Sequence, residues 1–264
     1  MSIQNIRNIN IWTKAIYWLA IPLICIYLIS MIIAPWIMSG GDWQYIQNVW
    51  DRWQSLNVGM LAFISTVGAF AVSMHGESQQ RERRFKSARA FLPEALSELI
   101  AYFKASSLFL VEAWGKTDGS VLPRSKVTLE ATMPMLPVGY KETFSRCIES
   151  AEPAVAEYLT YMLMCLQVHN SRLQELSSSF QEGARVVIVQ GNIITYLFRL
   201  SELQALTNKL FQFARGLENF DGEDINWEDF NNAYLNLDIH VEDFDDLEGF
   251  TKRAIERGSS YKAK

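Results

Sequence analysis

Two long apolar stretches dominate the first third of the chain. Residues 15–38 contain 24 positions without a charged side chain, and residues 56–74 contain 19. As helices with about 1.5 Å rise per residue they would reach roughly 36 and 28 Å, against a hydrocarbon core of roughly 30 Å. The pattern predicts two transmembrane helices. The alternatives are a cleaved signal peptide for the first stretch, disfavoured by its length and by the span that follows, and a buried soluble helix for the second.

The second stretch carries small residues on one helical face. Their separations of three, four, three and four residues place them on the same side of a helix. They are Gly59, Ala62, Thr66, Ala69 and Ser73. Helices associate in lipid through close backbone approach and hydroxyl hydrogen bonds, which small residues permit. We expect this helix–helix interface to contact either the first span or the same face of a second copy. The bulky residues expected to meet lipid are Met60, Phe63, Ile64, Val67 and Phe70.

From Gln79 onward, apolar positions recur every three or four residues, which predicts helices. A long helix is expected from Gln79 to near Trp114, bent or divided by Pro93, and a proline-rich connection is expected over 115–138. The further predicted helices are 140–150, 153–180, 182–217, 226–237 and 243–257. Asn226 with Asp229 suits a cap, and Gly258 suits a helix end. The run "VVIV" at 186–189 would suit a strand, but no second strand is available to pair with it.

These patterns predict an all-α membrane protein. Residues 1–78 would form an N-terminal tail and a two-helix transmembrane hairpin, and residues 79–264 a cytoplasmic helical bundle. The C-terminal helices are acidic, because residues 218–250 contain twelve Asp or Glu and no Lys or Arg. The cysteines Cys25, Cys147 and Cys165 form no CxxC pair, which argues against a disulfide framework and fits a reducing compartment.

Basic residues decide the predicted orientation, since they favour the cytoplasmic side of a membrane. Arg7 and Lys14 precede the first span without any acid, and the loop between the spans contains Asp42, Asp51 and Arg52. The residues expected to fix topology and to contact lipid headgroups follow the second span: Arg81, Arg83, Arg84, Lys86 and Arg89. Both termini are therefore expected in the cytoplasm, with the short loop outside.

Tryptophans surround the predicted loop. Indole rings favour the headgroup level of a membrane, because their faces are apolar and their N–H groups are polar. The expected interfacial aromatic residues are Trp36, Trp43, Trp50 and Trp53. They could form a simple aromatic belt, or the stretch "DWQYIQNVWDRWQ" could form a short amphipathic helix along the outer surface.

No residue set identifies a reaction, and we expect neither catalytic nor metal-binding nor cofactor-binding residues. His75, His169 and His240 are isolated from one another and form no Cys/His ligand set. The acidic stretch is no EF-hand, because Gly222 at the sixth loop position would put Leu217 at the first ligand position. It is either a solvated face or a docking surface for a basic partner. The net charge of −5 argues against a nucleic-acid partner.

Four segments carry a resemblance to a known family. They are "DRWQSLNVGMLAFISTVGAFAV", "RRFKSARAFLPEALSELIAY", "CIESAEPAVAEYLTYMLMCLQVHNSRL" and "NIITYLFRLSELQALTNKLFQFAR". In this order they resemble an uncharacterised family of bacterial inner-membrane proteins, often in prophage-type neighbourhoods, without an assigned activity. The resemblance covers about Trp53 to Arg215. It implies a bacterial inner-membrane location and a helical cytoplasmic domain.

Together these features predict a non-enzymatic, multi-pass inner-membrane protein. We expect a membrane-tethered, self-associating helical sensor or scaffold, with the lipid bilayer, further copies of itself and a cytoplasmic protein as partners. A role in phage response is suggested only by the neighbourhood of the resembling family. The alternative is a membrane-perturbing or pore-forming effector triggered through the cytoplasmic domain. The absence of ionisable side chains within the spans disfavours a selective channel.

Overall fold

The structure, a computed structural model, describes residues 18–117, 128–181 and 189–262. Every regular element among these residues is helical, so the predicted all-α class is confirmed. The chain divides into two compact units, Met1–Gln80 and Arg81–Lys264. Residues 15–17 of the first predicted span, residues 118–127 of the predicted connection and all but Val189 of the "VVIV" run lie outside the described residues.

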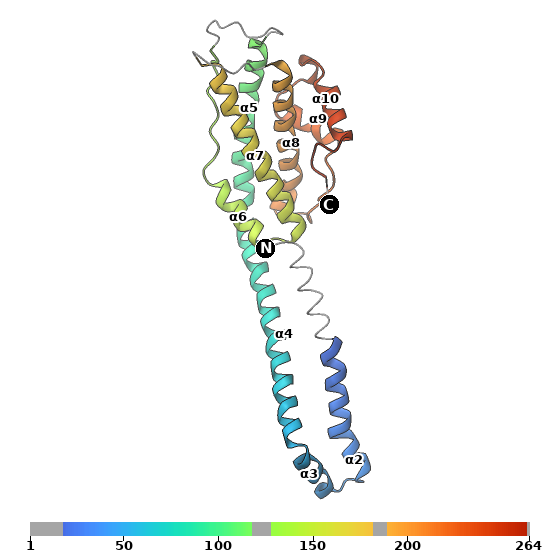
Figure 1. Cartoon of the computed structure of the whole chain (residues 1–264). Coiled ribbons are helices and arrows are strands. Elements are labelled where there is room, and N and C mark those ends of the chain that lie inside the picture. Colours follow the sequence, from blue (N-terminus) through green and yellow to red (C-terminus); the bar gives the residue numbers. More distant parts are fainter. Residues whose placement is uncertain (1–17, 118–127, 182–188, 263–264) are drawn as a thin grey trace. The chain divides into compact units, whose positions relative to one another are not determined.

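The described part of the first unit consists of two antiparallel helices joined by a turn region that contains a third, shorter helix (Figure 1). The N-terminal helix, Trp18–Met38, contains the π-helical segment η1 (Ile29–Ile33) and ends as α2 (Ala34–Met38). After a turn comes α3 (Trp43–Arg52). Asp42 caps its N-terminus, since the Asp42 carboxylate accepts a hydrogen bond from the amide of Gln44. The predicted loop therefore contains a helix, as in the second of the two alternatives for this stretch. The next helix, α4 (Gln54–Arg89), contains the second predicted span and the boundary between the units.

Pro93 divides the predicted long helix in two, as expected. α4 ends at Arg89, and α5 (Leu92–Lys116) begins with Pro93 in its first turn. A proline has no N–H to donate to the carbonyl four residues earlier, here that of Arg89, but it is tolerated in a first helical turn, where the N–H would have no helical partner. The sequence therefore sets the break at Ala90 and Phe91.

Three further helices of the second unit match their predicted positions within one residue, and a fourth, predicted over 182–217, begins eight residues later than expected, since Val189 is in an extended conformation. They are α6 (Tyr140–Ser150), α7 (Pro153–Ser179), α8 (Gln190–Ala214) and α9 (Trp227–Asn236). α8 packs against α5, α7 and α9, and 16 of its 25 residues are buried, so it is the central helix of the bundle. Residues 182–188, where a helix was also expected, lie outside the described part. At the start of α9, Asn226 and Asp229 form the predicted capping box.

The last predicted helix is wrong at its start and right at its end. Residues 241–243 form a 3₁₀ turn, η2 (Val241–Asp243), and α10 (Leu247–Glu256) begins four residues later than expected. The interruption lets both Phe244 and Leu247 reach the core, with Asp246 between them in the left-handed region at φ 62°. Gly258 ends the helix at φ 69° and donates its N–H to the carbonyl of Ile255, as its position predicted.

Candidate functional site

The first unit exposes an unusual amount of apolar surface. The N-terminal helix and the stretch Gln54–Lys116, which comprises α4 and α5, each contain an 18-residue window long and apolar enough to cross a membrane, with mean hydropathies of 2.3 and 1.7. Only 6% of either window is buried. A core helix of a soluble protein would be mostly buried, whereas these two windows leave a large apolar surface exposed, and by length and composition both could cross a membrane.

The N-terminal helix and α4 face each other with side chains of mixed size. The less exposed positions of the N-terminal helix are Ala20, Ile24, Tyr27, Met31, Ala34 and Pro35, and those of α4 within the first unit are Asn57, Met60, Ile64, Val67, Ala71 and Met74. The spacing of mostly three and four residues in both sets describes one face of each helix. Met60, Ile64 and Val67 were expected to meet lipid, but they lie on the less exposed face of α4. Phe63 and Phe70 remain exposed, as expected.

The small-residue stripe lies on the other side of α4. Gly59, Ala62, Thr66, Ala69 and Ser73 are all exposed. A Cβ added at Gly59 would meet no atom within 4 Å, so no helix packs closely there. At 100° per residue, the stripe and the less exposed face are roughly 150° apart around the helix axis. The structure therefore does not bring the stripe against the N-terminal helix, and it leaves this face available to another molecule.

Three side-chain hydrogen bonds fix the turn end of the first unit. Pro35 cannot donate a hydrogen bond to the carbonyl of Met31, four residues earlier. The indole N–H of Trp50 donates to this oxygen instead, at 2.9 Å. The hydroxyl of Tyr27 donates to Oδ1 of Asn57 at 3.0 Å, and the amide of Asn57 donates to the carbonyl of Trp50 at 3.3 Å. The sequence predicts Trp50 only as an interfacial aromatic residue. In the structure its indole N–H donates to the backbone oxygen that would otherwise accept from the residue at position 35, where proline has no N–H.

The other predicted interfacial tryptophans keep their rings exposed at the same end of the unit. Trp36 belongs to α2, Trp43 begins α3, and Trp53 follows α3. The rings of Trp43 and Trp50 meet edge to face, with centroids 6.4 Å apart. The four predicted tryptophans therefore belong to a single turn region.

The basic cluster has mixed roles. The Arg81 guanidinium donates to the carbonyls of Ser150 and Ala151, at the C-terminal end of α6, where cations are favoured. The Arg89 guanidinium lies over the Phe213 ring, 5.4 Å from its centroid. Lys86 pairs with Glu82 on the surface of α4. Arg83 and Arg84 are exposed and make no hydrogen bond or ion pair with any described residue. Of the five cations predicted to contact lipid headgroups, these two have no competing hydrogen bond or ion pair within the part of the chain that the structure describes.

A buried carboxylate that the sequence did not single out organises the second unit. Glu202 on α8 is fully buried. Its Oε1 accepts hydrogen bonds from the Tyr161 hydroxyl at 2.6 Å and from the Tyr261 amide at 2.9 Å, and its Oε2 accepts one from Arg199 at 2.6 Å. Arg199 also donates to the carbonyl of Ser259 at 2.8 Å. The cluster attaches the chain segment after α10 to α7 and α8.

The charges of this cluster shift the acidities of its neighbours. Burial raises the pKa of the Tyr161 hydroxyl, and the negative charge of Glu202 raises it further. Burial alone would lower the pKa of Arg199, but the nearby Glu202 carboxylate raises it overall. Burial, with a smaller contribution from Glu202, raises the pKa of the Cys165 thiol to about 11. The thiol is therefore protonated near neutral pH and is a poor nucleophile.

A second carboxylate holds the segment that follows the undescribed residues 118–127. Glu112 on α5 accepts hydrogen bonds from Lys116 at 2.5 Å and from the amides of Glu130 and Ala131 at 2.6 and 2.7 Å. The bond from Lys116, with those from the two amides, lowers the pKa of Glu112 to about 2. These contacts explain how an irregular segment is held against α5.

The histidines show no metal-binding arrangement. His169 is buried in the bundle, its ring edge to face with that of Tyr102, and its Nε2 has no hydrogen-bond partner. Burial lowers its pKa to about 3. Among the described residues, no three His, Cys, Asp or Glu side chains gather in a group that could hold a metal ion.

Comparisons of the chain with protein families, with curated proteins and with solved structures give no match. The geometry of the two units is therefore the basis for a functional proposal.

Proposed function

We propose that the protein is a membrane-tethered, self-associating helical scaffold or sensor. The N-terminal helix and α4 cross the bacterial inner membrane as a hairpin, and the bundle binds a protein partner in the cytoplasm. The observation that carries the proposal is the pair of apolar helices. Only 6% of the most apolar 18-residue window of each helix is buried.

The exposed stripe on α4 supports self-association. In a bilayer, bulky apolar side chains interact with lipid about as well as with one another, so close packing between small residues decides which faces meet. The stripe is exposed, while Met60, Ile64 and Val67 occupy the less exposed face. A second copy presenting the same stripe would allow close approach of two backbones.

The basic residues at the end of the spanning part support the orientation. Arg83 and Arg84 have no partner among the described residues and follow the apolar run of α4 within ten positions of Met74. Basic side chains at such a position favour the cytoplasmic leaflet. The N-terminal helix and α4 run antiparallel, so this orientation also puts the start of the N-terminal helix on the cytoplasmic side.

The bundle has surface features that a protein partner could cover. Large apolar side chains are exposed on α5, at Leu108 and Val111, and on α7, at Met164 and Val168. α4 extends without interruption from the stripe to Arg89. A change in association of the stripe could therefore be transmitted to the bundle through one continuous helix.

Cross-linking in membranes tests the proposal. The variant Ala62→Leu with Ala69→Leu adds bulk within the stripe, whereas Ser65→Leu with Val72→Leu adds bulk to an exposed face outside it. We expect the first variant to lose most of its cross-linked oligomer and the second to retain it. Equal cross-linking of both variants would contradict self-association through the stripe. Dye release from vesicles containing the wild-type chain would instead support the membrane-perturbing alternative.

A further inference from the structure

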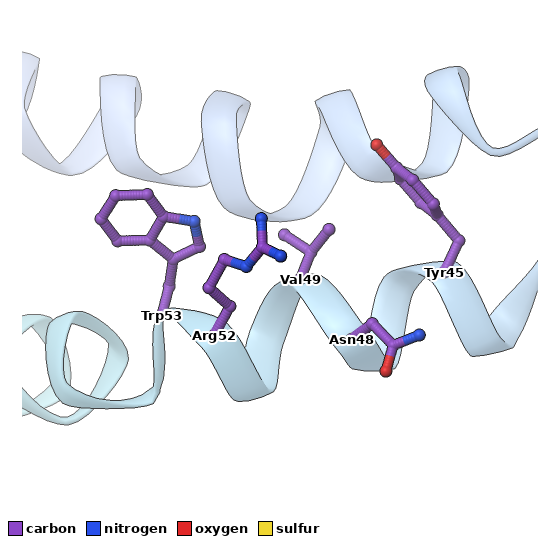
Figure 2. A pocket seen from close by; sticks show the side chains of 5 residues that line it. All are labelled: Tyr45, Asn48, Val49, Arg52 and Trp53. Carbon is purple, nitrogen blue, oxygen red and sulfur yellow. The ribbon is translucent and has the colours of Figure 1, made fainter.

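A shallow hollow of about 180 Å³ lies on one side of α3, lined by Tyr45, Asn48, Val49, Arg52 and Trp53 (Figure 2). A single water needs roughly 10–15 Å³ on this scale, so the hollow has room for a group much larger than water. Figure 2 shows the side chains of Tyr45, Val49, Arg52 and Trp53 rising from the same side of the chain. These four residues follow one another at separations of four, three and one along the chain.

The hollow gathers hydrogen-bond donors around one positive charge. Arg52 is the only Lys or Arg between residues 18 and 80. The guanidinium of Arg52, the hydroxyl of Tyr45, the amide of Asn48 and the indole N–H of Trp53 can all donate. Within the described residues, none of these four groups has a hydrogen bond or an ion pair. In contrast, the nearby Trp50 indole is already occupied by the carbonyl of Met31.

Unoccupied donors around an arginine suit an oxyanion. The planar guanidinium fits phosphate in two-point contacts, and the Tyr45 hydroxyl and the Trp53 indole, which rise on the same side, can donate to the remaining oxygens. Among the described residues, no carboxylate pairs with Arg52, and the neighbouring Asp51 makes no ion pair with it. The chemistry therefore matches a phosphate group.

The surroundings favour a phosphate carried by lipid over a free one. Exposed apolar side chains lie at the same turn end of the unit, among them Ile37, Met38 and Trp43. A soluble anion gains nothing from such neighbours, whereas a phospholipid places ester and acyl groups beside its phosphate. Val49 contributes an apolar surface within the hollow itself.

We propose that this side of α3 binds the phosphate of an anionic phospholipid in the outer leaflet, with Arg52 as the charged contact. The proposal rests on the proposed membrane crossing, which would put the turn region at headgroup depth. Binding there would fix the outer end of the hairpin, as Arg83 and Arg84 are proposed to fix the inner end.

Native mass spectrometry of the purified, delipidated full chain tests this site. Phosphatidylglycerol is titrated against a glucosyl diacylglycerol with the same acyl chains, which has no phosphate. We expect Arg52→Gln to weaken phosphatidylglycerol binding about tenfold, the change that loss of one charge-assisted hydrogen bond produces, without affecting the glycolipid. Tyr45→Phe should weaken it less. Arg146→Gln, which removes an exposed cation of α6, should bind both lipids as the wild type does.

Three outcomes would overturn the site. Equal phosphatidylglycerol binding by Arg52→Gln and the wild type, with unchanged helix content by circular dichroism, would remove Arg52 from the interaction. Equal weakening of glycolipid binding would replace phosphate recognition by general lipid contact. Competition by glycerol phosphate as effective as that by the lipid would assign the hollow to a soluble ligand. A different result would contradict the proposed function itself: a purified chain that remains soluble without detergent.

Discussion

At the scale of single residues, the buried His169 makes stability depend on pH. Its folded pKa of about 3 lies below the usual value of 6.5 because burial disfavours the charged ring. Between these two values the unfolded chain takes up a proton that the folded chain does not. The contribution of His169 to the free energy of unfolding should therefore be complete above about pH 6.5. Below that pH it should decrease by at most about 1.4 kcal/mol per pH unit.

Denaturation of the detergent-solubilised chain between pH 4 and 7 measures this dependence. We expect His169→Leu to reduce the slope in this range, because no group remains there to take up the proton on unfolding. His240→Leu changes an exposed histidine and should leave the slope as it is. The same slope in the wild type and in His169→Leu would assign the dependence to other groups.

The contact between Trp50 and Met31 gives a second prediction at this scale. Trp50→Phe removes the donor to the Met31 carbonyl and should destabilise the hairpin by about 1 kcal/mol. Pro35→Ala restores an N–H in the helix that can bond the same oxygen. Trp50→Phe should therefore cost less in a Pro35→Ala background, as measured by a double-mutant cycle of unfolding in detergent. Strict additivity of the two changes would rule out this coupling.

At the scale of elements, Glu202 connects the segment after α10 to α7 and α8. Tyr161→Phe removes one of its three hydrogen bonds and should lower the free energy of unfolding by about 1–2 kcal/mol. Glu202→Leu leaves the partly buried Arg199 without its carboxylate and should cost more, about 3 kcal/mol. Limited proteolysis should then cleave the C-terminal segment faster in Glu202→Leu.

Glu142→Leu provides the matched comparison, because this glutamate pairs with Arg146 in an exposed position on α6. Exposed ion pairs contribute little to stability, so this variant should unfold and be cleaved as the wild type is. If both glutamate variants behaved alike, the buried cluster would not hold the segment.

The sequence predicts the elements better than it predicts their contacts. Helical periodicity, Pro93 and the Asn226 cap place most described helices within a few residues, because these signals are local. No local signal sets the start of α10, because it depends on both Phe244 and Leu247 reaching the core. Glu202 lies among apolar residues in "LFRLSELQAL", where the local pattern indicates only a charged residue on the surface of a helix. Its hydrogen-bond partner Tyr161 is 41 residues away, so no local pattern predicts their contact.

The candidate site shows the same limit. Small-residue spacing identifies a stripe on α4, but spacing alone leaves open whether the stripe meets the N-terminal helix or another copy. The exposure of Gly59 and Thr66, set against the burial of Met60, distinguishes the two faces. The role of Trp50 requires knowing that it lies 2.9 Å from a carbonyl that precedes Pro35 by four positions, which no local pattern contains.

At the scale of the whole molecule, the proposal requires both ends of the chain on the cytoplasmic side. A reporter protein active only in the cytoplasm, fused after Lys264, should be active, and one active only in the periplasm should be inactive. Fusions that end at Gly41, within the turn, should give the opposite pattern. The reason is that two crossings return the chain to its starting side, and that Arg83 and Arg84 favour the cytoplasmic leaflet.

Charge changes extend this topology test, because the arginines should determine the orientation and not merely accompany it. Arg83→Glu with Arg84→Glu removes the two cations without a protein partner and should give a mixture of orientations, seen as partial activity of both reporters. Lys252→Glu with Arg257→Glu removes the same charge far from the apolar runs and should leave the orientation uniform, since the rule acts within about 15–20 residues of a span. A periplasmic signal from the wild-type Lys264 fusion would contradict the orientation, and with it the proposed cytoplasmic partner.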